Sequence, residues 1–466
     1  MPIILAVGAW LPSFIAPARA DTKPSVVLIL TDDQRWDTLW AMPNVRRQLV
    51  AHGVMFTNAF VVNSLCCPSR ASILTGEYSH STGVYTNVPW NHGGFLAFRP
   101  HEKSTVATWL DRAGYRTALV GKYLNFYGSA ARAGHVPPGW DRWVAFAENN
   151  GHYYNYRLTI DGRIRYFGND PRDYSTDVLK DYAVDFIRRR RGPLFLYFAP
   201  YAPHGPPIPA PRDASRFSGL PPYRPPNFNE QDVSDKPRWV RALPRLSSTR
   251  ISHIDAARRK SYASLLAVDK AVGAIVDALR DTHRLGNTLI VFMSDNGYAV
   301  GEHRWNYKMS PYEESIRVPF VVRYDRLTRG GWRDRHLALN IDLAPTFARL
   351  ARSRPATPVD GRSFLPLLRR VHARWRHAFL VEHLWTQRDQ AYMPTYCAVR
   401  TDRYMTVIYQ NETKPFYNRE LYDLTRDPFE LKNRAHDRAY AEVFRSMKPR
   451  LRALCDPPPP RYKLPF

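Results

Sequence analysis

The sequence predicts an α/β fold in which one large, mostly parallel sheet lies between layers of helices. Short apolar runs without a break are typical of strands buried on both faces, and they occur at 25–30, 116–120, 193–200 and 287–294. Helical patterns separate these runs, notably at 104–114 and 261–279. Strands that alternate with helices in this way form parallel sheets covered by helices. The 466 residues, 44% of them hydrophobic, suffice for one large domain and a smaller one.

Each expected element has its own local signal. The first strand, SVVLIL, is followed by the strand-like stretch VMFTNAFVV at 54–62 and the helix-like stretch SRASILT at 69–75. The helical pattern STVATWLDRAG leads into the second strand, RTALV. The last two strands, PLFLYFAP and NTLIVFMS, flank the long helical pattern SYASLLAVDKAVGAIVDAL. This order places helical patterns between the first two expected strands and between the last two.

The first twenty residues resemble a signal peptide. They are apolar and end in Ala18-Arg19-Ala20, a small-residue pattern at which such peptides are cleaved, so we expect cleavage before Asp21 and a periplasmic or secreted protein. The basic residues that usually open a signal peptide are absent, and a hydrophobic N-terminal strand is the alternative. No later stretch is long and apolar enough to span a bilayer.

The formal net charge of +25 suggests an anionic partner. Nucleic acid, an anionic membrane surface and an anionic small substrate all fit this sign. The longest basic run is only Arg188–Arg191, so no dense basic arm for nucleic acid is present. An arginine-rich solvated surface is the alternative explanation.

The four cysteines fall into two pairs. Cys397 and Cys455 can form one disulfide across a long loop in an exported protein. Cys66 and Cys67 are adjacent, and neighbouring residues seldom meet the geometry of an S–S bond. Both are buried small hydrophobes in the simplest interpretation.

Polar residues follow all four apolar runs and predict a shared site. Ligands of such sheets bind beyond the carboxyl ends of the strands. The residues are Asp32 and Asp33 after the first run, Lys122 after the second, His204 after the third, and Asp295 and Asn296 after the fourth. Three carboxylates and an amide oxygen suit a hard cation, Ca²⁺ or Mg²⁺, and do not suit zinc.

The remaining residue types suggest group-transfer chemistry at that site. Lys122 and Lys308 would neutralise charge on the transferred group, and His204 is a candidate general acid or base, or else a structural histidine. Cys66 precedes a helix-like stretch, so its side chain would lie near backbone amides and Arg70, which can hold an anion. A nucleophile that faces a metal and an anion cradle is typical of a group-transfer enzyme.

At this point the motifs resemble those of type I sulfatases. CCPSR at 66–70 fits the family element Cys-x-Pro-x-Arg, in which the cysteine is oxidised to formylglycine. Only Cys66 begins the element, because a frame that starts at Cys67 puts Ser69 where the proline belongs. LILTDDQ, VGKYLN, APYAPHGPP and MSDNGYAVGEH resemble the family's other site segments in the same order. The ordered series is far more specific than any one of these motifs.

The resemblance implies a fold and a set of roles. It implies an alkaline-phosphatase-like fold with a catalytic domain at 21–370 and, at 371–466, a subdomain formed by a small antiparallel sheet packed by a helix. It implies one ion, Ca²⁺ rather than Mg²⁺, and a formylglycine-generating enzyme as maturation partner. The implied metal ligands are Asp32, Asp33, Cys66, Asp295 and Asn296, and the implied catalytic residues are Cys66, Arg70, Lys122, His204 and Lys308. The substrate-binding candidates are Asn125, His303 and His80. For the two histidines, a structural role is the alternative.

Finer motifs resemble one branch, the N-acetylglucosamine-6-sulfatases, which act on sulfated glucosamine in glycosaminoglycans. These motifs are GKYLNFYG, PPGWDRWVAF, YYNYRLTIDGR and DYSTDVL. An arylsulfatase of other specificity, a phosphatase or phosphonate monoester hydrolase on the same scaffold, and a polyanion-binding protein with a lapsed site are the alternatives. Ligands for one metal, with no second cluster of His and Asp, favour a monoanionic sulfate ester, and the intact ligand set argues against a lapsed site.

One position departs from the family pattern. Many sulfatases carry a histidine two residues after the loop lysine, where this chain has Leu124 followed by Asn125. An amide can replace a hydrogen bond but cannot act as an acid near neutral pH. Protonation of the leaving group would then fall to Lys308, His204 or His303.

The segment 205–260 is the expected sugar-binding loop. Loops of this length in compact domains are usually functional, and this one begins beside His204. Its cations would meet sulfate or carboxylate groups and its aromatic rings a pyranose, with a solvated structural loop as the alternative. The expected contacts are Tyr223, Arg224, Lys236, Arg238, Trp239 and Arg241.

Overall fold

The computed structural model describes residues 23–89, 92–130, 134–189, 192–328, 330–370, 373–387, 391–410 and 418–466. The expected signal peptide at 1–20 lies outside these ranges. Across the described ranges, none of the helices combines the length and apolar character that crossing a membrane requires.

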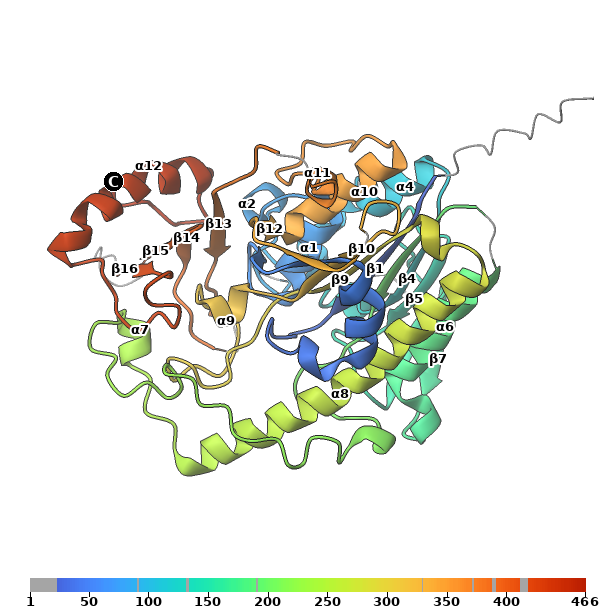
Figure 1. Cartoon of the computed structure of the whole chain (residues 1–466), viewed down its shortest axis with the longest axis horizontal. Coiled ribbons are helices and arrows are strands. Elements are labelled where there is room, and N and C mark those ends of the chain that lie inside the picture. The colour runs from blue at the N-terminus through green and yellow to red at the C-terminus, as the bar shows by residue number, and fades with distance from the viewer. Residues whose placement is uncertain are drawn as a thin grey trace, which may run out of the picture.

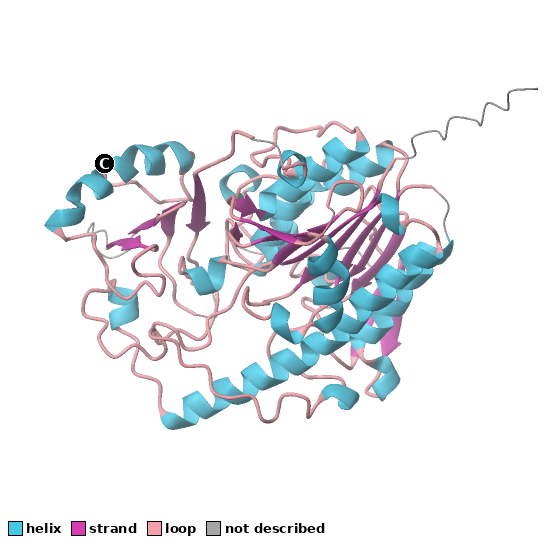
Figure 2. Cartoon of the chain, in the orientation of Figure 1, coloured by secondary structure: helices cyan, strands magenta, loops and turns pink. Residues whose placement is uncertain are grey.

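A ten-stranded sheet forms the centre of the molecule, in the order β11-β2-β10-β9-β1-β8-β4-β5-β6-β7 (Figure 2). Its five central strands run parallel, and the first four of them were predicted from the sequence. They are β9 (Thr288–Ser294), β1 (Ser25–Thr31), β8 (Leu194–Ala199), β4 (Arg116–Gly121) and β5 (Arg142–Phe146). Antiparallel pairs extend both edges through β10 (Phe320–Arg323), β2 (Val54–Phe56), β6 (Tyr156–Ile160) and β7 (Arg163–Phe167), and β11 (Trp332–Asp334) pairs in parallel with β2. The sheet is therefore mixed and mostly parallel at its centre.

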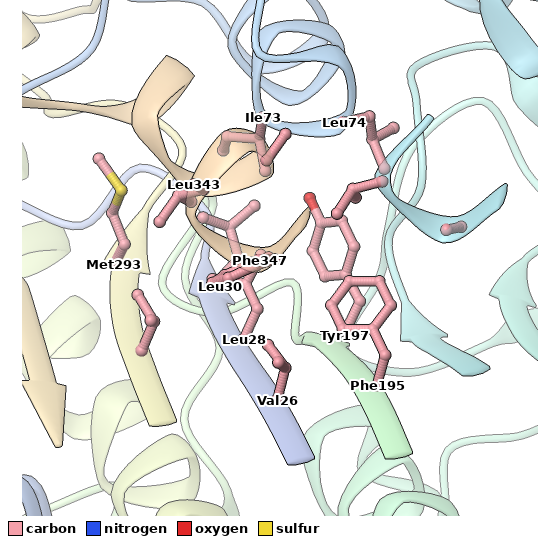
Figure 3. Close-up of a cluster of buried hydrophobic side chains, with 14 of the residues drawn as sticks. Val26, Leu28, Leu30, Ile73, Leu74, Phe195, Tyr197, Met293, Leu343 and Phe347 are labelled. Atoms are coloured by element: carbon pink, nitrogen blue, oxygen red, sulfur yellow. The ribbon is translucent and has the colours of Figure 1, made fainter. Parts of the chain in front are cut away.

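The central strands are mostly apolar because both of their faces are covered. Successive side chains of a strand point to opposite faces. Leu28 and Leu30 pack with α1 (Cys66–Thr75), α3 (Gly94–Phe98), α4 (Val106–Arg112), α10 (Leu343–Ala351) and α11 (Leu365–Leu368). Val27 and Ile29 pack with α6 (Ser175–Arg189), α8 (Ser248–Asp281) and the π-helical turn η2 (Val45–Leu49) on the other face (Figure 1). Figure 3 shows Ile73 and Leu74 of α1 gathered with Phe347 of α10 over the first of these faces.

Short elements complete the connections between the layers. The helical ones are η1 (Leu39–Ala41), η3 (Val50–His52), α2 (Ser79–Thr82), η4 (Arg99–Lys103), α5 (Tyr127–Ala130), η5 (Pro171–Asp173), η6 (Pro211–Asp213), α7 (Arg238–Arg241), η7 (Leu285–Asn287), α9 (Glu313–Ile316), η8 (Asn340–Asp342) and η9 (Arg438–Tyr440). The strands β3 (Ala59–Phe60) and β12 (Ala338–Leu339) pair with each other.

Two expected boundaries differ in the structure. The helix expected at 261–279 begins at Ser248, where the Ser247 hydroxyl accepts a hydrogen bond from the Arg250 amide as an N-cap. Between Ser248 and Lys260 only Ile254 is buried, so the first turns carry no apolar periodicity that would have revealed them. The strand-like stretch 54–62 is two short strands, because β2 pairs with β10 in the large sheet and β3 with β12 in a separate one.

A second, antiparallel sheet follows in the C-terminal part, as expected. It consists of β13 (Ala378–His383), β14 (Tyr396–Thr401), β15 (Tyr404–Tyr409) and β16 (Arg419–Asp423) in sequential order. The helix α12 (Ala441–Leu454) packs against it (Figure 1). Its core continues into the N-terminal part through Phe60 and Ile341, so the small sheet is fixed to the large unit by buried apolar contacts.

The structure joins Cys397 of β14 to Cys455, which follows α12, in a disulfide that spans 58 positions. Cys66 and Cys67 are free and buried. The bridge closes a long loop of the chain, and a cross-link of this kind restricts the unfolded ensemble most when the loop is long.

We expect the Cys397→Ala/Cys455→Ala variant to lose about 2–4 kcal/mol of unfolding free energy, because the unfolded chain regains the entropy of the open loop. Denaturant unfolding with and without reductant measures this loss. The wild type should respond to reductant and the double variant should not. Equal unfolding midpoints for oxidised and reduced wild type would contradict the expectation.

Candidate active site

The four predicted strand ends lie side by side. β9, β1, β8 and β4 are consecutive strands of the sheet and run parallel, so their carboxyl ends share one edge. Thr31 is in register with Ser294, and the amide of Asp295 donates to the Thr31 carbonyl at 3.0 Å. The backbone itself therefore places the two aspartates after β1 beside Asp295, which follows β9.

A glycine at the end of β4 lets the chain turn Lys122 into the site. Gly121 has a φ of +126°, and a Cβ there would lie 2.0 Å from the Ala199 carbonyl oxygen of β8. The Lys122 amide donates to that carbonyl at 2.8 Å. The Lys122 ammonium then reaches Asp32 Oδ2 at 2.5 Å.

Helix α1 carries the cysteine to the same place. Cys66 is its first residue, and the apolar side chains further along the helix hold it on the sheet. The Cys66 sulfur lies 2.7 Å from Lys308 Nζ and 3.5 Å from Asp32 Oδ1. Cys67 instead packs in the core between α1 and the sheet. Of the two adjacent thiols, Cys66 is the one directed at the ionised groups.

Arg70, one turn along α1, is completely buried and paired. Its Nε donates to Asp295 Oδ2 at 2.7 Å, and a terminal nitrogen donates to the Lys122 carbonyl at 2.8 Å. The other terminal nitrogen is 3.5 Å from Asp32 Oδ2. A buried guanidinium is tolerated only with such partners, so Arg70 ties α1 to the ends of three strands.

Lys308 and Asn296 converge on Asp33 from the other side. Lys308 Nζ lies 2.6 Å from Asp33 Oδ1, and the Asn296 amide nitrogen donates to the same oxygen at 2.7 Å. Asp33 has a left-handed φ of 65°, a conformation that aspartate tolerates better than most residues. The Asn296 Oδ1 atom is buried and has no hydrogen-bond partner among the described residues.

His204 completes the group. Its Nδ1 lies 2.7 Å from the Gly205 carbonyl, to which it can only donate, and its Nε2 lies 3.6 Å from Asp33 Oδ2. Burial lowers the pKa of His204 to about 4, so the imidazole is neutral at pH 7 with Nε2 as its acceptor.

The donor atoms fit a hard divalent cation. One ligand atom each from Asp32, Asp33, Cys66 and His204 lies within 4.8 Å of the others. The unpartnered Asn296 oxygen adds a neutral oxygen donor beside Asp33. Asp295 is engaged with Arg70 through Oδ2 and accepts the Asp33 amide at 3.1 Å through Oδ1. Carboxylate and amide oxygens of this kind suit Ca²⁺ or Mg²⁺.

The formal charges of the six buried ionic side chains cancel. Lys122, Lys308 and Arg70 oppose Asp32, Asp33 and Asp295, and each of the six is at most 8% exposed. Burial acts to raise the pKa of Asp32, but Lys122 and other cations hold it below its usual range. Burial, with Asp32 nearby, raises the pKa of Asp295 to about 6. Burial also raises the pKa of the Cys66 thiol to about 12, so the unmodified thiol is protonated at pH 7.

A pocket of about 250 Å³ opens over this group. Lys308 and His204 line it together with Asn125, as the sequence analysis anticipated for a substrate site. Buried Oδ1 atoms of Asn125 and Asn150 have no hydrogen-bond partner among the described residues. The pocket thus offers unpaired amide groups directly above buried cations.

The side chain of Leu124 points into the core, which explains why this position departs from the family's histidine. Leu124 is 3% exposed and belongs to the core between α1 and the sheet. Asn125 is the next residue and lines the pocket. The polar side chain at this turn is therefore that of Asn125, one residue later than the histidine of the family pattern.

The two other histidine candidates lie outside the pocket lining. Among the described residues, no active-site group donates a hydrogen bond to His80. Its Nδ1 is 3.1 Å from Glu382 of β13. His303 is 1% exposed, and its Nδ1 is 2.7 Å from Glu230. The described structure does not bring either histidine to Cys66.

The expectation for segment 205–260 is wrong for its buried members. Lys236 is 3% exposed and donates to the Leu431 carbonyl at 2.5 Å. Trp239 is 4% exposed and packs edge-on against Trp305 at 5.3 Å. Arg224 is held by Asp255 through two hydrogen bonds of 2.9 and 2.6 Å. Lys236 and Trp239 hold the segment to the rest of the protein, whereas Arg224 pairs within the segment and is exposed, as are Arg238 and Arg241.

Sequence reasoning missed the pocket residues Asn149 and Asn150. They follow β5, a fifth strand of the parallel centre that was not among the four predicted apolar runs. The same strand-end rule that found the other residues would have found them.

Family models match most of the chain. A sulfatase model matches residues 24–353, and a model for the C-terminal part of N-sulphoglucosamine sulphohydrolase matches residues 301–456. The family match and the curated relatives show a hydrolase of sulfuric esters. The chain belongs to the sulfatase family, whose members generally depend on a metal ion and on formylglycine.

The chain is similar to sulfatases that act on sugars. It is 34% identical over 473 residues to human N-acetylglucosamine-6-sulfatase, covering 92% of this chain and 84% of that one. A solved structure in complex with its substrate D-glucosamine-2-N,6-O-disulfate superposes with a TM-score of 0.82 at 24% identity, over 95% of this chain and 100% of that one. The phosphonate monoester hydrolase of Agrobacterium radiobacter shares the fold, with a TM-score of 0.72 at 22% identity over 93% and 96% of the chains.

We expect the purified protein to contain about one Ca²⁺ or Mg²⁺ in the Asp32–Asp33 group. Asn296→Ala removes the unpartnered amide oxygen and should lower this content, as elemental analysis after dialysis would measure. Asn125→Ala, which removes an equally unpartnered amide oxygen from the pocket lining, is the matched control and should retain the cation. Equal content in both variants would show that Asn296 is not a ligand.

Proposed function

We propose that this enzyme removes the 6-O-sulfate from N-acetylglucosamine at the end of a glycosaminoglycan chain. The observation that carries the proposal is the position of Cys66, whose sulfur contacts Lys308 at 2.7 Å beside a pocket rich in asparagine. The 34% identity to human N-acetylglucosamine-6-sulfatase supports the choice of sugar.

A bound cation and a formylglycine residue, neither of which is present in the chain as translated, would complete the site. We assign the cation to Asp32, Asp33, Asp295 and Asn296 with the oxidised residue 66. Their oxygens suit Ca²⁺ or Mg²⁺, and the resemblance to the family favours Ca²⁺. A cation there supplies positive charge for the sulfate oxygens. Formylglycine, made from Cys66 by a formylglycine-generating enzyme, supplies a hydrated aldehyde with two hydroxyl groups. The protonated, poorly nucleophilic thiol is consistent with the need for this oxidation.

The chain's own cations would bind the sulfate ester. Although burial acts to lower it, Asp33 raises the pKa of Lys308 well above its usual range, and Asp32 likewise raises that of Lys122. Both ammonium groups therefore remain charged and can hold sulfate oxygens in a water-poor site. Arg70, pinned to Asp295, would keep residue 66 and the first turn of α1 in place.

Proton transfers fall to Lys308 and His204, which both line the pocket. Lys308 remains protonated and is the better donor to the leaving sugar oxygen, because His204 is neutral at pH 7 and Asn125 cannot ionise. His204, with Nδ1 fixed on Gly205, presents Nε2 as the acceptor for a proton when sulfate is released.

Recognition of the sugar would rest on neutral groups. Asn125 and Asn150 have free amide oxygens in the pocket, and amides pair well with hydroxyl and acetamide groups. This separates the site into a charged part for sulfate and an uncharged part for the ring.

We also propose that the chain is exported and organised as a signal peptide at 1–20, a catalytic domain at 21–370 and a C-terminal subdomain at 371–466. The Cys397–Cys455 disulfide supports export, because such bridges persist in oxidising compartments.

Cys66→Ala should abolish turnover, whereas Cys67→Ala should retain most of it, since Cys67 only fills the core. Peptide mass spectrometry of the wild type should place the aldehyde on residue 66. Equal loss of activity in the two variants, with both proteins folded, would refute the assignment.

The substrate assignment predicts a higher kcat/KM for N-acetylglucosamine 6-sulfate at a non-reducing end than for a generic aryl sulfate or a phosphonate monoester. Asn150→Ala should lower kcat/KM for the sugar by about tenfold, the effect of one lost hydrogen bond, and affect the aryl sulfate less.

Higher ionic strength should weaken binding of a longer polyanion more than that of the monosaccharide, because exposed charge pairs are screened. A preference for aryl sulfate, without sulfate release from the sugar, would overturn the substrate while leaving the sulfatase chemistry intact.

A further inference from the structure

A second group of metal-ligating side chains lies where the C-terminal sheet meets the catalytic part. His303, Glu314 and Glu430 each bring one ligand atom within 4.8 Å of the others. His303 and Glu430 are 1% exposed and Glu314 is 9% exposed. The sequence analysis expected no second cluster of His and Asp, and this one escaped because its acids are glutamates and Glu430 lies 127 positions after His303.

His303 is oriented as a ligand. Its Nδ1 lies 2.7 Å from Glu230 Oε2, and its ring packs on Tyr312 at 4.2 Å. Glu230 is itself held by Lys236 at 3.2 Å. A carboxylate that accepts from Nδ1 fixes the tautomer in which Nε2 is unprotonated, the usual second contact of a metal-bound histidine.

The two glutamates of this group lack a cationic side-chain partner. Neighbouring acids have their own cations: Glu302 pairs with Arg35 at 2.9 Å and Glu313 with Arg400 at 2.9 Å. No lysine or arginine in the described ranges forms an ion pair with Glu314 or Glu430. Two buried carboxylates side by side require either protons or a bound cation.

Unused oxygen atoms point to a ligand rather than to internal pairing. Glu430 uses Oε2 for the Glu313 amide at 3.0 Å, and its Oε1 has no hydrogen-bond partner among the described residues. Glu314 Oε2 is likewise unpartnered. Asn227, fully buried, contacts Glu314 Oε1 at 2.9 Å and His303 Nε2 at 3.3 Å through its amide nitrogen, while its own Oδ1 has no partner within the described ranges.

We propose that His303, Glu314 and Glu430 bind a structural Zn²⁺ ion, with Asn227 able to offer a fourth ligand. One imidazole and two carboxylates suit zinc, whereas Ca²⁺ prefers six or more oxygens. The ion would join Glu430, which follows β16, to the segment 303–314 of the catalytic part. That segment contains Lys308, so the ion would also hold the active-site lysine loop in place. The inference is independent of the identity of the substrate.

The test uses the full-length protein, stripped with chelator and then kept in excess Ca²⁺ so that the oxygen-rich active site is filled. Calorimetric titration with Zn²⁺ should show one equivalent bound and a rise in melting temperature. Glu430→Gln should weaken zinc binding at least tenfold, and Glu230→Gln, which loses only the orienting partner, by about 10–100-fold. Asp32→Asn, in the active-site group, is the control that should leave zinc affinity unchanged.

Stability of the stripped proteins supplies a second readout. Without zinc, Glu430→Gln should be at least as stable as the wild type, because it removes an unpaired buried carboxylate. With zinc, only the wild type should gain stability. The proposal is overturned if no equivalent of zinc binds. It is also overturned if zinc binding is abolished by Asp32→Asn and preserved by Glu430→Gln. In either case the two glutamates would be stabilised by protonation instead. If Glu430→Gln fails to fold, His303→Asn in the same titration decides between these outcomes.

Discussion

The active site depends on six buried charges that compensate one another at a single edge of the sheet. Removing one partner of a buried ion pair leaves an uncompensated charge and typically costs about 3–5 kcal/mol. Asp32 and Lys122 are 2.5 Å apart and Asp33 and Lys308 2.6 Å, and neither pair forms unless the strand ends hold their register. The polar network is therefore only as precise as the apolar sheet beneath it, where β1 is buried along its whole length.

The C-terminal sheet helps to position this charge network through the loop that carries Lys308. The Tyr396 hydroxyl of β14 donates to the Met309 carbonyl at 2.8 Å, and the Met309 amide donates to the Ser64 carbonyl at 3.1 Å. Met309 follows Lys308 and has a left-handed φ of 75°. Lys308 is thus positioned between the turn before α1 and the small sheet, which explains why the two units share one apolar core.

Sequence reasoning reached those features whose cause is local. A strand buried on both faces leaves an unbroken apolar run, so the four central strands and the polar residues after them were predictable, and the Cys66–Arg70 motif is contiguous. Features that depend on distant contacts were not. The first turns of α8 are held by a cap and solvent rather than by an apolar face. The cluster at His303 joins segments far apart in the chain, and the burial of Lys236 depends on the carbonyl of Leu431.

The charge balance also bears on the order of events at the site. The excess of 25 positive charges lies outside the six-residue network, whose formal charges sum to zero. A neutral network offers an anion little net attraction, however close its lysines are, because each lysine is already paired with a carboxylate. A divalent cation changes the local sum to +2, which attracts the monoanionic sulfate ester and frees the lysines from complete neutralisation. Cation binding should therefore precede productive binding of the anion, and the asparagines above it can then select the sugar without adding charge.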